Sequence, residues 1–312
     1  MNSFHVTPAS MADAQAITDL IIACDIDEYG VPDIVLQDTL DILQGLTLET
    51  DTWVIRDDAS AITGFAFWEQ QAEGKLISYG YVHPEHKGCG IGAELLQHLE
   101  QRSTAAMSSS GGSSQGDWIL SNVIPALNEQ AKKLLEDRGY KFVRLYSRMN
   151  IDLTEAPPVP EAAQGILVAP FQQDQDEAPV FEAYRESFQG SRLYTEKTME
   201  AWLEERTGEH HDRSLWFTAY EGSEIAGFLT SKNFGDHVYV DLLGVRPSFR
   251  KRGIGLALLE HVFQEAYRKD ITKVMLSVDA TSLTNAHKLY SRAGMEPLFQ
   301  MAMYSKSLKE QN

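Results

Sequence analysis

One sequence pattern occurs twice in the chain, and this repeat restricts the possible folds more than any other feature. The segments Val82–Gly92 and Val245–Gly255 both begin with Val-x-Pro and both end with Gly-Ile-Gly after basic residues. They lie 163 residues apart, as do Trp53 and Trp216. An offset that is kept over such a length indicates a tandem duplication. The chain is therefore predicted to contain two copies of one domain.

The offset between the copies shortens after the glycine turn. Gly139 and Gly294 are only 155 residues apart. The first copy contains the low-complexity stretch Ser108–Ser114, which has no counterpart in the second copy. A run of serine and glycine is typical of a solvated loop. We therefore predict a loop insertion here.

The length of the chain suits two domains. With 312 residues, of which 43% are hydrophobic, each half can bury its own core. The acidic, proline-rich stretch Glu155–Glu161 is typical of an extended spacer. We predict domains at residues 1–153 and 165–312, joined by a linker at 154–164.

Each copy shows the same order of hydrophobic patterns. Three strand-like segments precede each glycine turn, the third being Lys75–Val82 in the first copy. The segment after the turn has helical spacing, with Leu95, Leu96 and Leu99 on one face. A strand, a helix that ends at Gly139 or Gly294, and a final strand follow. This order predicts a mixed α/β domain, present twice.

The net charge of −18 excludes several classes of partner. Nucleic acids and anionic membrane surfaces both require a basic footprint. No apolar run approaches the roughly 20 residues of a membrane-spanning helix, and the N-terminus lacks the layout of a secretion signal. We therefore predict a cytoplasmic protein that binds neither nucleic acid nor membrane. Against this acidic background, Arg250-Lys251-Arg252 predicts a local anion site.

The cysteines and histidines give no metal-binding pattern. Cys24 and Cys89 have neither disulfide nor metal spacing, and they are predicted to be free thiols. Cys89 lies inside the glycine turn, where we expect an inert small residue. His210-His211 lies in a charged stretch without a third ligand in the sequence, so both rings are predicted to be solvated.

The glycine turn predicts a phosphate site. A helix that starts at Gly-x-Gly directs unpaired N–H groups outward, and glycine allows a diphosphate to approach the main chain. A dinucleotide-binding turn would need a third glycine where Leu258 stands, and the Gly-Lys-Ser/Thr of a P-loop is absent from both copies.

Two motifs carry a family resemblance. Arg250-x-x-Gly253-x-Gly255 resembles the Arg/Gln-x-x-Gly-x-Gly/Ala signature of the GNAT superfamily of acyl-CoA N-acyltransferases, and the stretch Ala286–Gly294 resembles its later motif. The tandem arrangement is similar to that of the mycothiol synthase family. The resemblance implies an α/β fold of two tandem GNAT-like domains. Each would have a mixed, mostly antiparallel sheet with helices on both faces and a splayed parallel strand pair.

The resemblance implies acetyl-CoA as the acyl donor and assigns the residues that bind it. In the second copy these are Leu243, Gly244, Val245, Arg250, Lys251, Arg252, Gly253, Ile254, Gly255 and Leu256. In the first copy they are Gly80, Tyr81, Val82, Lys87, Gly88, Cys89, Gly90, Ile91, Gly92, Ala93 and Asn128. Lys87 replaces the usual Arg/Gln. Ser282 stands in the second copy where an Asn is common, whereas Asn128 keeps that Asn in the first.

The two copies differ in their candidate catalytic groups. GNAT enzymes let an amine attack the thioester directly, and Tyr290 matches the position of the acid that protonates the departing thiolate. The first copy has Leu135 there, which cannot donate a proton. Asp241 alternates in phase with Leu243 and Val245, so it is a candidate base or amine-orienting group. We therefore predict catalysis in the second domain and a catalytically degenerate first domain.

The predicted reaction transfers an acetyl group from acetyl-CoA to a primary amine of a small molecule or a protein. The acidic composition suits a cationic acceptor through electrostatic steering. The alternative is a non-catalytic acyl-CoA-binding regulatory protein, which the degenerate first domain favours. A first domain that only completes the substrate cleft is compatible with the enzyme hypothesis.

Overall fold

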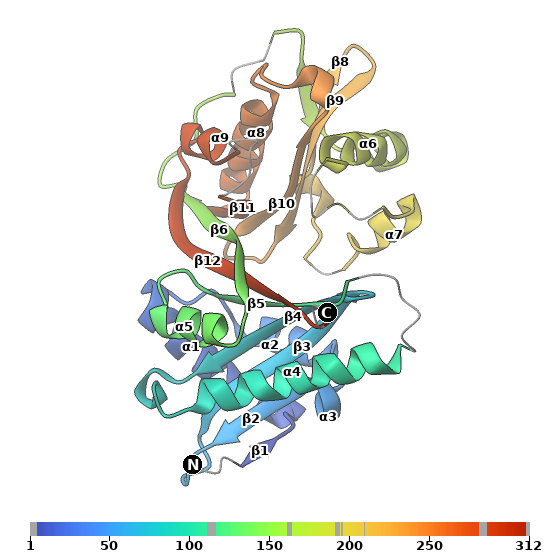
Figure 1. The fold of residues 1–312 in the computed structure, drawn as a ribbon. Coiled ribbons are helices and arrows are strands. Elements are labelled where there is room, and N and C mark those ends of the chain that lie inside the picture. The colour runs from blue at the N-terminus through green and yellow to red at the C-terminus, as the bar shows by residue number, and fades with distance from the viewer. Residues whose placement is uncertain are drawn as a thin grey trace. The chain divides into compact units, whose positions relative to one another are not determined.

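The computed structural model describes residues 5–110, 117–160, 164–190, 194, 196–208, 210–280 and 286–309. The chain divides into two compact units (Figure 1). Unit 1 comprises Met1–Tyr146 together with Phe299–Asn312, and unit 2 comprises Ser147–Leu298. In each unit, helices precede three antiparallel strands, and a helix, a strand, a helix and a strand follow. This is the order that the sequence repeat predicts.

The strands of unit 1 are hydrogen-bonded in the order β1-β2-β3-β4-β5-β12. Its elements are β1 (Val6–Thr7), α1 (Ala14–Tyr29), α2 (Leu36–Gln44), α3 (Leu48–Asp51), β2 (Thr52–Arg56), β3 (Ile62–Ala72), β4 (Lys75–Val82), α4 (Ile91–Ser109), β5 (Ile119–Pro125), α5 (Glu129–Asp137) and the first part of β6 (Lys141–Asp152). The sixth strand is the later part of β12 (Glu296–Ser307). Only β4 and β5 are parallel neighbours among the pairs of this unit, so its sheet is mixed and mostly antiparallel.

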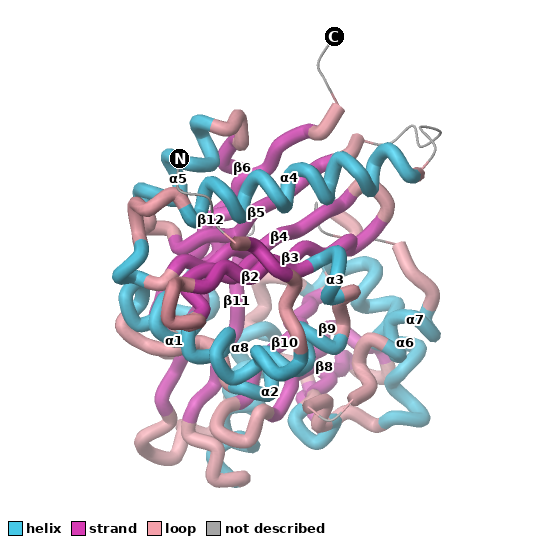
Figure 2. Tube along the Cα trace, turned by 90° about the horizontal axis from the view of Figure 1, so that it is seen from below, coloured by secondary structure: helices cyan, strands magenta, loops and turns pink. Residues whose placement is uncertain are grey.

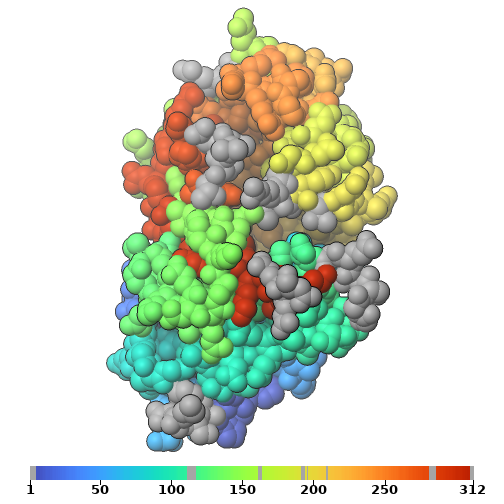
Figure 3. Space-filling model, in the orientation of Figure 1, coloured from blue at the N-terminus to red at the C-terminus, as the bar shows by residue number. Residues whose placement is uncertain are grey.

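Helices cover both faces of the unit 1 sheet. The leucines at 95, 96 and 99 direct one side of α4 onto β3 and β4, while α1 and α2 pack on the opposite face against Phe65 and Phe67 (Figures 1 and 2). The other side of α4 is exposed (teal in Figure 3). Fully burying a leucine side chain contributes about 2 kcal/mol, so these contacts hold α4 and the glycine turn before it in place.

The parallel strands of unit 1 separate toward their carboxyl ends. The pairing of β4 with β5 runs only from Lys75 opposite Ile119 to Ser78 opposite Asn122. Both strands continue beyond this point, to Val82 and Pro125. The main-chain groups on the facing edges of the two strand ends are therefore left for other partners.

Unit 2 repeats this architecture in the order β6-β11-β10-β9-β8-β7. Its elements are the later part of β6, β7 (Leu167–Pro170), α6 (Gln173–Phe188), α7 (Met199–Glu204), β8 (Phe217–Glu221), β9 (Glu224–Asn233), β10 (Val238–Val245), α8 (Ile254–Arg268), β11 (Lys273–Asp279), α9 (Ala286–Arg292) and the start of β12. In the parallel pair β10 and β11, Val238 lies opposite Val274 and Tyr239 opposite Met275, and the pairing extends no further. These two strands therefore separate even earlier than β4 and β5. α8 covers one face of the sheet and α6 with α7 covers the other.

The last strand corrects the predicted domain boundaries. Residues Met301–Ser307 of β12 pair antiparallel with Pro125–Ile119 of β5 in unit 1. The residues from Phe299 onward therefore belong to unit 1, and not to a domain at 165–312. Likewise the later part of β6 belongs to unit 2. The reason is that each long strand satisfies its hydrogen bonds with a strand distant in sequence.

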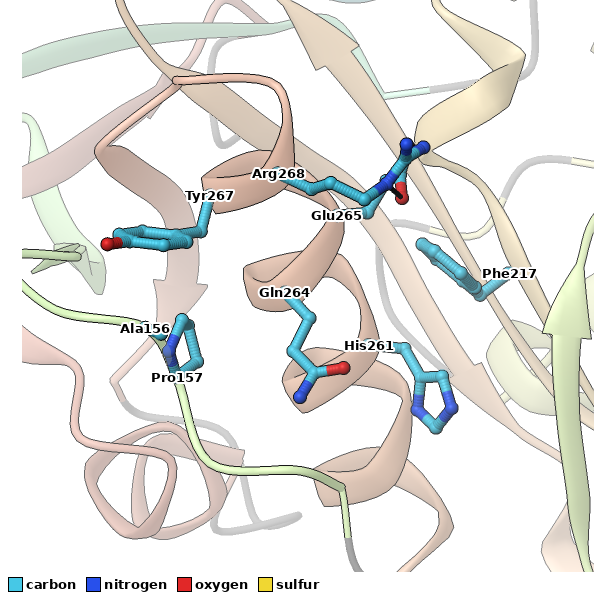
Figure 4. A pocket seen from close by; sticks show the side chains of 8 residues that line it. All are labelled: Ala156, Pro157, Phe217, His261, Gln264, Glu265, Tyr267 and Arg268. Atoms are coloured by element: carbon cyan, nitrogen blue, oxygen red, sulfur yellow. Dashed lines mark hydrogen bonds and ion pairs between the residues drawn. The ribbon is translucent and has the colours of Figure 1, made fainter.

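Two predicted irregular segments also differ in detail. Ser108 and Ser109 end helix α4, and the rest of the predicted loop from residue 111 lies outside the described residues. The predicted linker is not a free spacer, because Gln264 on α8 donates a hydrogen bond to the carbonyl of Pro158 at 2.9 Å. Figure 4 shows Ala156 and Pro157 alongside α8, where they border a cavity of about 290 Å³. Among the described residues, no helix is long and apolar enough to cross a membrane.

Candidate functional site

The two glycine turns have the same backbone conformation. The N-cap residue of α4 is Gly90 with φ 93°, and that of α8 is Gly253 with φ 83°. Two residues earlier, Gly88 and Lys251 are also left-handed, with φ 80° and 64°. Neither helix has a side-chain cap within the described part of the chain. The first N–H groups of both helices are therefore available to an anion such as a diphosphate.

Lys251 stores strain in the second turn. A residue with a Cβ in the left-handed region costs about 1–2 kcal/mol, which glycine avoids at some loss of chain entropy. We expect Lys251→Gly to raise the free energy of unfolding by about 1 kcal/mol, measured by urea denaturation. Lys251→Ala removes the same charge but keeps the strain, so it should give no such gain. Equal stability of the two variants would contradict the strain assignment.

The predicted cofactor residues of the first copy come together around one cavity. This cavity lies in unit 1 and has a volume of about 450 Å³. Ten of the eleven predicted residues line it, namely Gly80, Tyr81, Val82, Lys87, Gly88, Gly90, Ile91, Gly92, Ala93 and Asn128. Cys89 is exposed and is not among the residues that line it. The separated ends of β4 and β5 and the start of α4 thus form one pocket.

A carboxylate that the sequence motifs did not reveal lies among these groups. Glu28 near the end of α1 forms an ion pair with Lys87 at 2.5 Å and accepts a hydrogen bond from Asn128 Nδ2 at 2.7 Å. Lys87 also pairs with Asp27. The negative charge of an acidic residue in the last turn of a helix interacts unfavourably with the helix dipole. That unfavourable placement is the sequence signal that points to a role outside the helix.

Asn128 has a second contact that orients it. Its Oδ1 accepts a hydrogen bond from the N–H of Ala131 at 2.9 Å and so caps α5. A ligand that needs the Asn128 amide N–H would therefore compete with Glu28 alone.

The arginines of the second turn contact protein groups. Arg250 donates to the carbonyls of Val245 at 3.1 Å and Ser187 at 3.0 Å, and Arg252 is paired with Glu221. Both guanidinium groups thus contact protein groups of unit 2, and the anion site at this basic run stays a prediction. Lys251 is exposed, and the start of α8 has no side-chain cap among the described residues.

The other predicted cofactor residues of the second copy pack tightly. A Cβ on Gly255 would lie 2.9 Å from Leu289 of α9, and a Cβ on Gly244 would lie 2.4 Å from the ring of Phe228. Leu243 and Val245 pack against the core on the α8 side. Ile254 is buried and Leu256 is partly exposed. Ser282 lies outside the described residues.

Tyr290 lies on α9 and is only partly buried. Burial raises the pKa of its hydroxyl to about 12, and the nearby Tyr239 on β10 adds to this rise. The phenol is therefore protonated at neutral pH and can act as a proton donor. The guanidinium of Arg148 lies 5.2 Å from the centre of the Tyr239 ring. Leu135, at the equivalent place in unit 1, is buried in the core.

Asp241 does not lie on the face that strict alternation predicts. A β-bulge in β10 falls between Val240 and Leu242, so Asp241 is the extra residue. Its carboxylate is 3.4 Å from the buried guanidinium of Arg206 on the α7 side of the sheet, whereas Leu243 packs on the α8 side. The prediction that Asp241 shares a face with Leu243 is wrong, because the bulge reverses the alternation.

Arg206, the ion-pair partner of Asp241, is itself fixed by further contacts. Arg206 stacks on Trp202 at 4.4 Å and donates to the Trp202 carbonyl at 2.9 Å, so the guanidinium is held firmly. The Asp241 carboxylate is therefore held in a fixed position, which suits a group that orients an acceptor.

His210 and His211 are less exposed than the sequence predicts. His211 is partly buried, and this burial lowers the pKa of its ring, while Lys232 lowers it further and Asp241 acts in the opposite direction. The ring of His210 stacks on Phe234 at 4.5 Å. No group of side chains among the described residues could hold a metal ion.

Both cysteines are free thiols. Cys24 on α1 donates to the carbonyl of Val82 at 3.2 Å, and burial raises the pKa of its thiol to about 12. It is therefore protonated and unreactive at neutral pH.

Comparisons with known proteins agree with this geometry. A model of the acetyltransferase (GNAT) family matches residues 178–295, and a model of an acetyltransferase (GNAT) domain matches residues 49–142. The structure of a GCN5-related N-acetyltransferase from Sphaerobacter thermophilus is 32% identical, with a TM-score of 0.91. The similarity covers 99% of this chain and 97% of that one. The chain belongs to the GNAT family of acetyltransferases.

Other known proteins are similar to most or all of the length of this GNAT protein. A mycothiol acetyltransferase from Catenulispora acidiphila is 24% identical over 82% of each chain, and one from Thermobispora bispora is 27% identical over 76% and 77%. A tandem GNAT protein from the clavulanic acid biosynthesis pathway has the same fold, with a TM-score of 0.69 at 14% identity over 99% of this chain and 100% of that one. The predicted fold class, an α/β fold of two tandem GNAT domains, is confirmed.

Proposed function

We propose that this GNAT protein transfers the acetyl group of acetyl-CoA to a primary amine of a small molecule, and that unit 2 carries out the transfer. The observation that carries this assignment is Tyr290, a protonated phenol near the separated strands β10 and β11. Unit 1 has the buried Leu135 in its place. The relatives named mycothiol acetyltransferase support a small-molecule acceptor in preference to a protein amine.

The donor would bind through the main chain. Acetyl-CoA supplies an activated thioester, and its diphosphate would accept hydrogen bonds from the first N–H groups of α8, with Lys251 adding positive charge. Leu243 to Val245 would offer main-chain groups to the pantetheine, because β10 has no pairing with β11 beyond Tyr239. Glycine at 255 allows α8 to lie close to α9, which carries Tyr290.

The chemistry would need one acid and one orienting group. Asp241, held by Arg206, would orient the acceptor so that its neutral nitrogen faces the thioester carbon. The new C–N bond forms as the C–S bond breaks, and the hydroxyl of Tyr290 gives its proton to the departing sulfur. The proton lost by the nitrogen passes to water and restores the phenol. The products are an acetamide and CoA with a free thiol.

A second candidate function is acyl-CoA binding in unit 1 without transfer. The cavity of about 450 Å³ lined by Lys87, Asn128 and the start of α4 supports it. Such a unit would bind the donor through the same turn but has no acid at Leu135. Binding in unit 1 and transfer in unit 2 are compatible in one chain.

Calorimetric titration of acetyl-CoA into the full-length protein tests both functions. We expect two sites, of which Gly92→Val removes the one in unit 1 and Gly255→Val the one in unit 2, because each added side chain obstructs a helix start. Gly190→Val is a matched control, since its Cβ meets no atom within 4 Å. Melting curves of all variants check that they fold.

The transfer itself is followed by the release of free CoA thiol with a panel of small amines. No binding of acetyl-CoA at all would overturn the proposal. A single site that only Gly92→Val removes, together with no turnover, would favour the non-catalytic candidate.

A further inference from the structure

A guanidinium outside the Arg250–Gly255 signature holds the glycine turn of unit 2. Arg246 follows the last residue of β10 and precedes the single 3-10 turn Pro247–Phe249. We propose that Arg246 is a positioning residue, which fixes the glycine turn to the end of α6 and so prepares it for the donor. The inference rests on the proposed donor site of unit 2 and concerns a side chain outside that site.

The Arg246 side chain makes four hydrogen bonds to other elements. Its Nε and Nη2 each donate to one carboxylate oxygen of Glu186 on α6, both at 2.8 Å. Its Nη1 donates to Glu224 at 2.7 Å and to the carbonyl of Ile225 at 3.1 Å, both at the start of β9. A guanidinium has five N–H groups, so protein groups satisfy most of them. The side chain is therefore held in one orientation between α6 and β9.

The contact with Glu186 has the geometry of a strong ion pair. A single ion pair at the surface contributes little, whereas two parallel hydrogen bonds from one guanidinium add strength and fix the direction of the contact. These hydrogen bonds lower the pKa of the Glu186 carboxyl. Glu186 lies in the last turn of α6, where a negative charge interacts unfavourably with the helix dipole. Its partner in the glycine turn accounts for this placement.

The main chain of the turn is fixed at the same point. The N–H of Arg246 donates to the carbonyl of Ala226 on β9 at 3.0 Å, and its own carbonyl accepts from the N–H of Phe249 at 2.9 Å. The guanidinium also lies 5.9 Å from the centre of the buried Phe249 ring. The next residues, Arg250–Gly253, lead directly into α8. The contacts of Arg246 therefore fix the segment that places the first N–H groups of α8.

Unit 1 holds its glycine turn in a similar way with a different residue. The repeat offset places His83 at the position of Arg246, and the His83 ring makes a local contact with a main-chain N–H two residues later. In that unit Lys87 contacts Asp27 and Glu28 in the last turn of α1. A basic side chain of the turn thus pairs with the end of the preceding helix in both units. Its recurrence at different positions supports a role in placing the turn.

A positioning role can be distinguished from attraction of the donor phosphates by charge alone. If Arg246 acted only through its charge, removing the negative charge of Glu186 would strengthen the binding of an anionic donor. If Arg246 acts by fixing the turn, Arg246→Gln and Glu186→Gln both break the same contact. Both variants should then weaken donor binding.

Hydrogen–deuterium exchange of the full-length protein without ligand tests the contact itself. The main-chain N–H groups of Arg250–Gly255 should exchange at least about fivefold faster in Arg246→Gln and in Glu186→Gln, because a charged hydrogen-bond pair that opposes local opening is lost. Arg268→Gln is the matched control, since it breaks a two-pronged ion pair with Glu265 on α8 itself. Unchanged exchange of the turn in folded Arg246→Gln and Glu186→Gln proteins would overturn the proposal.

Calorimetric titration of acetyl-CoA connects the contact to the donor. In full-length protein that carries Gly92→Val, only the proposed site of unit 2 remains. Arg246→Gln and Glu186→Gln should each weaken binding there at least about fivefold, because a loosened turn must be ordered again when the donor binds. Weaker binding in Arg246→Gln but tighter binding in Glu186→Gln would overturn the positioning role in favour of a charge effect. If the unmodified protein binds no acetyl-CoA, the proposed function fails, and the exchange rates still decide whether Arg246 fixes the turn.

Discussion

Replacing Tyr290 by phenylalanine should lower kcat for acetyl transfer by about 100-fold, because general acid catalysis contributes on that scale. The binding constant of acetyl-CoA should not change, since the hydroxyl acts only on the departing sulfur. Burial raises the pKa of Tyr290 to about 12. The phenol therefore stays protonated through the neutral and mildly alkaline range. Loss of activity through its ionisation should begin only as the pH approaches 12.

The matched control for this variant is Tyr239→Phe. Tyr239 on β10 is an aromatic neighbour of Tyr290. Removing the Tyr239 hydroxyl perturbs the same region without taking away the proposed acid. Steady-state kinetics of both variants with one amine distinguish the roles. Equal kcat values for Tyr290→Phe and the unmodified protein would exclude Tyr290 as the acid.

Ending the chain at Leu298 should unfold unit 1 although it removes only the last residues of the sequence. The truncation takes away the strand that pairs with β5, together with the buried Phe299, Ala302 and Tyr304. Burial of the two large side chains alone contributes about 2 kcal/mol each. A folded domain is stable by only about 5–15 kcal/mol, so the lost strand is a large share of its stability.

Thermal unfolding of the truncated protein measures this effect. We expect the transition of unit 1 to disappear and that of unit 2 to remain, because Ser147–Leu298 keeps all the strands of its own sheet. A shorter truncation that ends after Lys309 keeps β12 and should behave as the full chain does. A truncation at Leu298 with an intact unit 1 transition would show that this strand is dispensable.

The glycine turns show how far local sequence predicts local structure. Gly90 and Gly253 start their helices in the left-handed conformation that the motif requires, and ten of the predicted residues of the first copy line one cavity. These features follow from residues close together in the chain. Glycine alone adopts this backbone easily, and the leucines after it have helical spacing.

The side-chain contacts of the site did not follow from the motifs. Arg250 contacts the carbonyls of Val245 and Ser187, although its position in the signature predicted a phosphate ligand. Glu28 lies about 60 residues before Lys87 and no motif contains it, yet it binds Lys87 and Asn128. Such contacts depend on which elements the fold brings together.

The sequence by itself determined the duplication, the α/β order of each unit, the two glycine turns and the difference between Tyr290 and Leu135. Each of these is a matter of residue type and spacing within one segment. Only the tertiary structure decided that β12 completes unit 1 and that the bulge turns Asp241 toward Arg206. The physical reason is that a strand chooses its partner and its register by hydrogen bonds and packing with distant segments, and a shift of one residue exchanges its two faces.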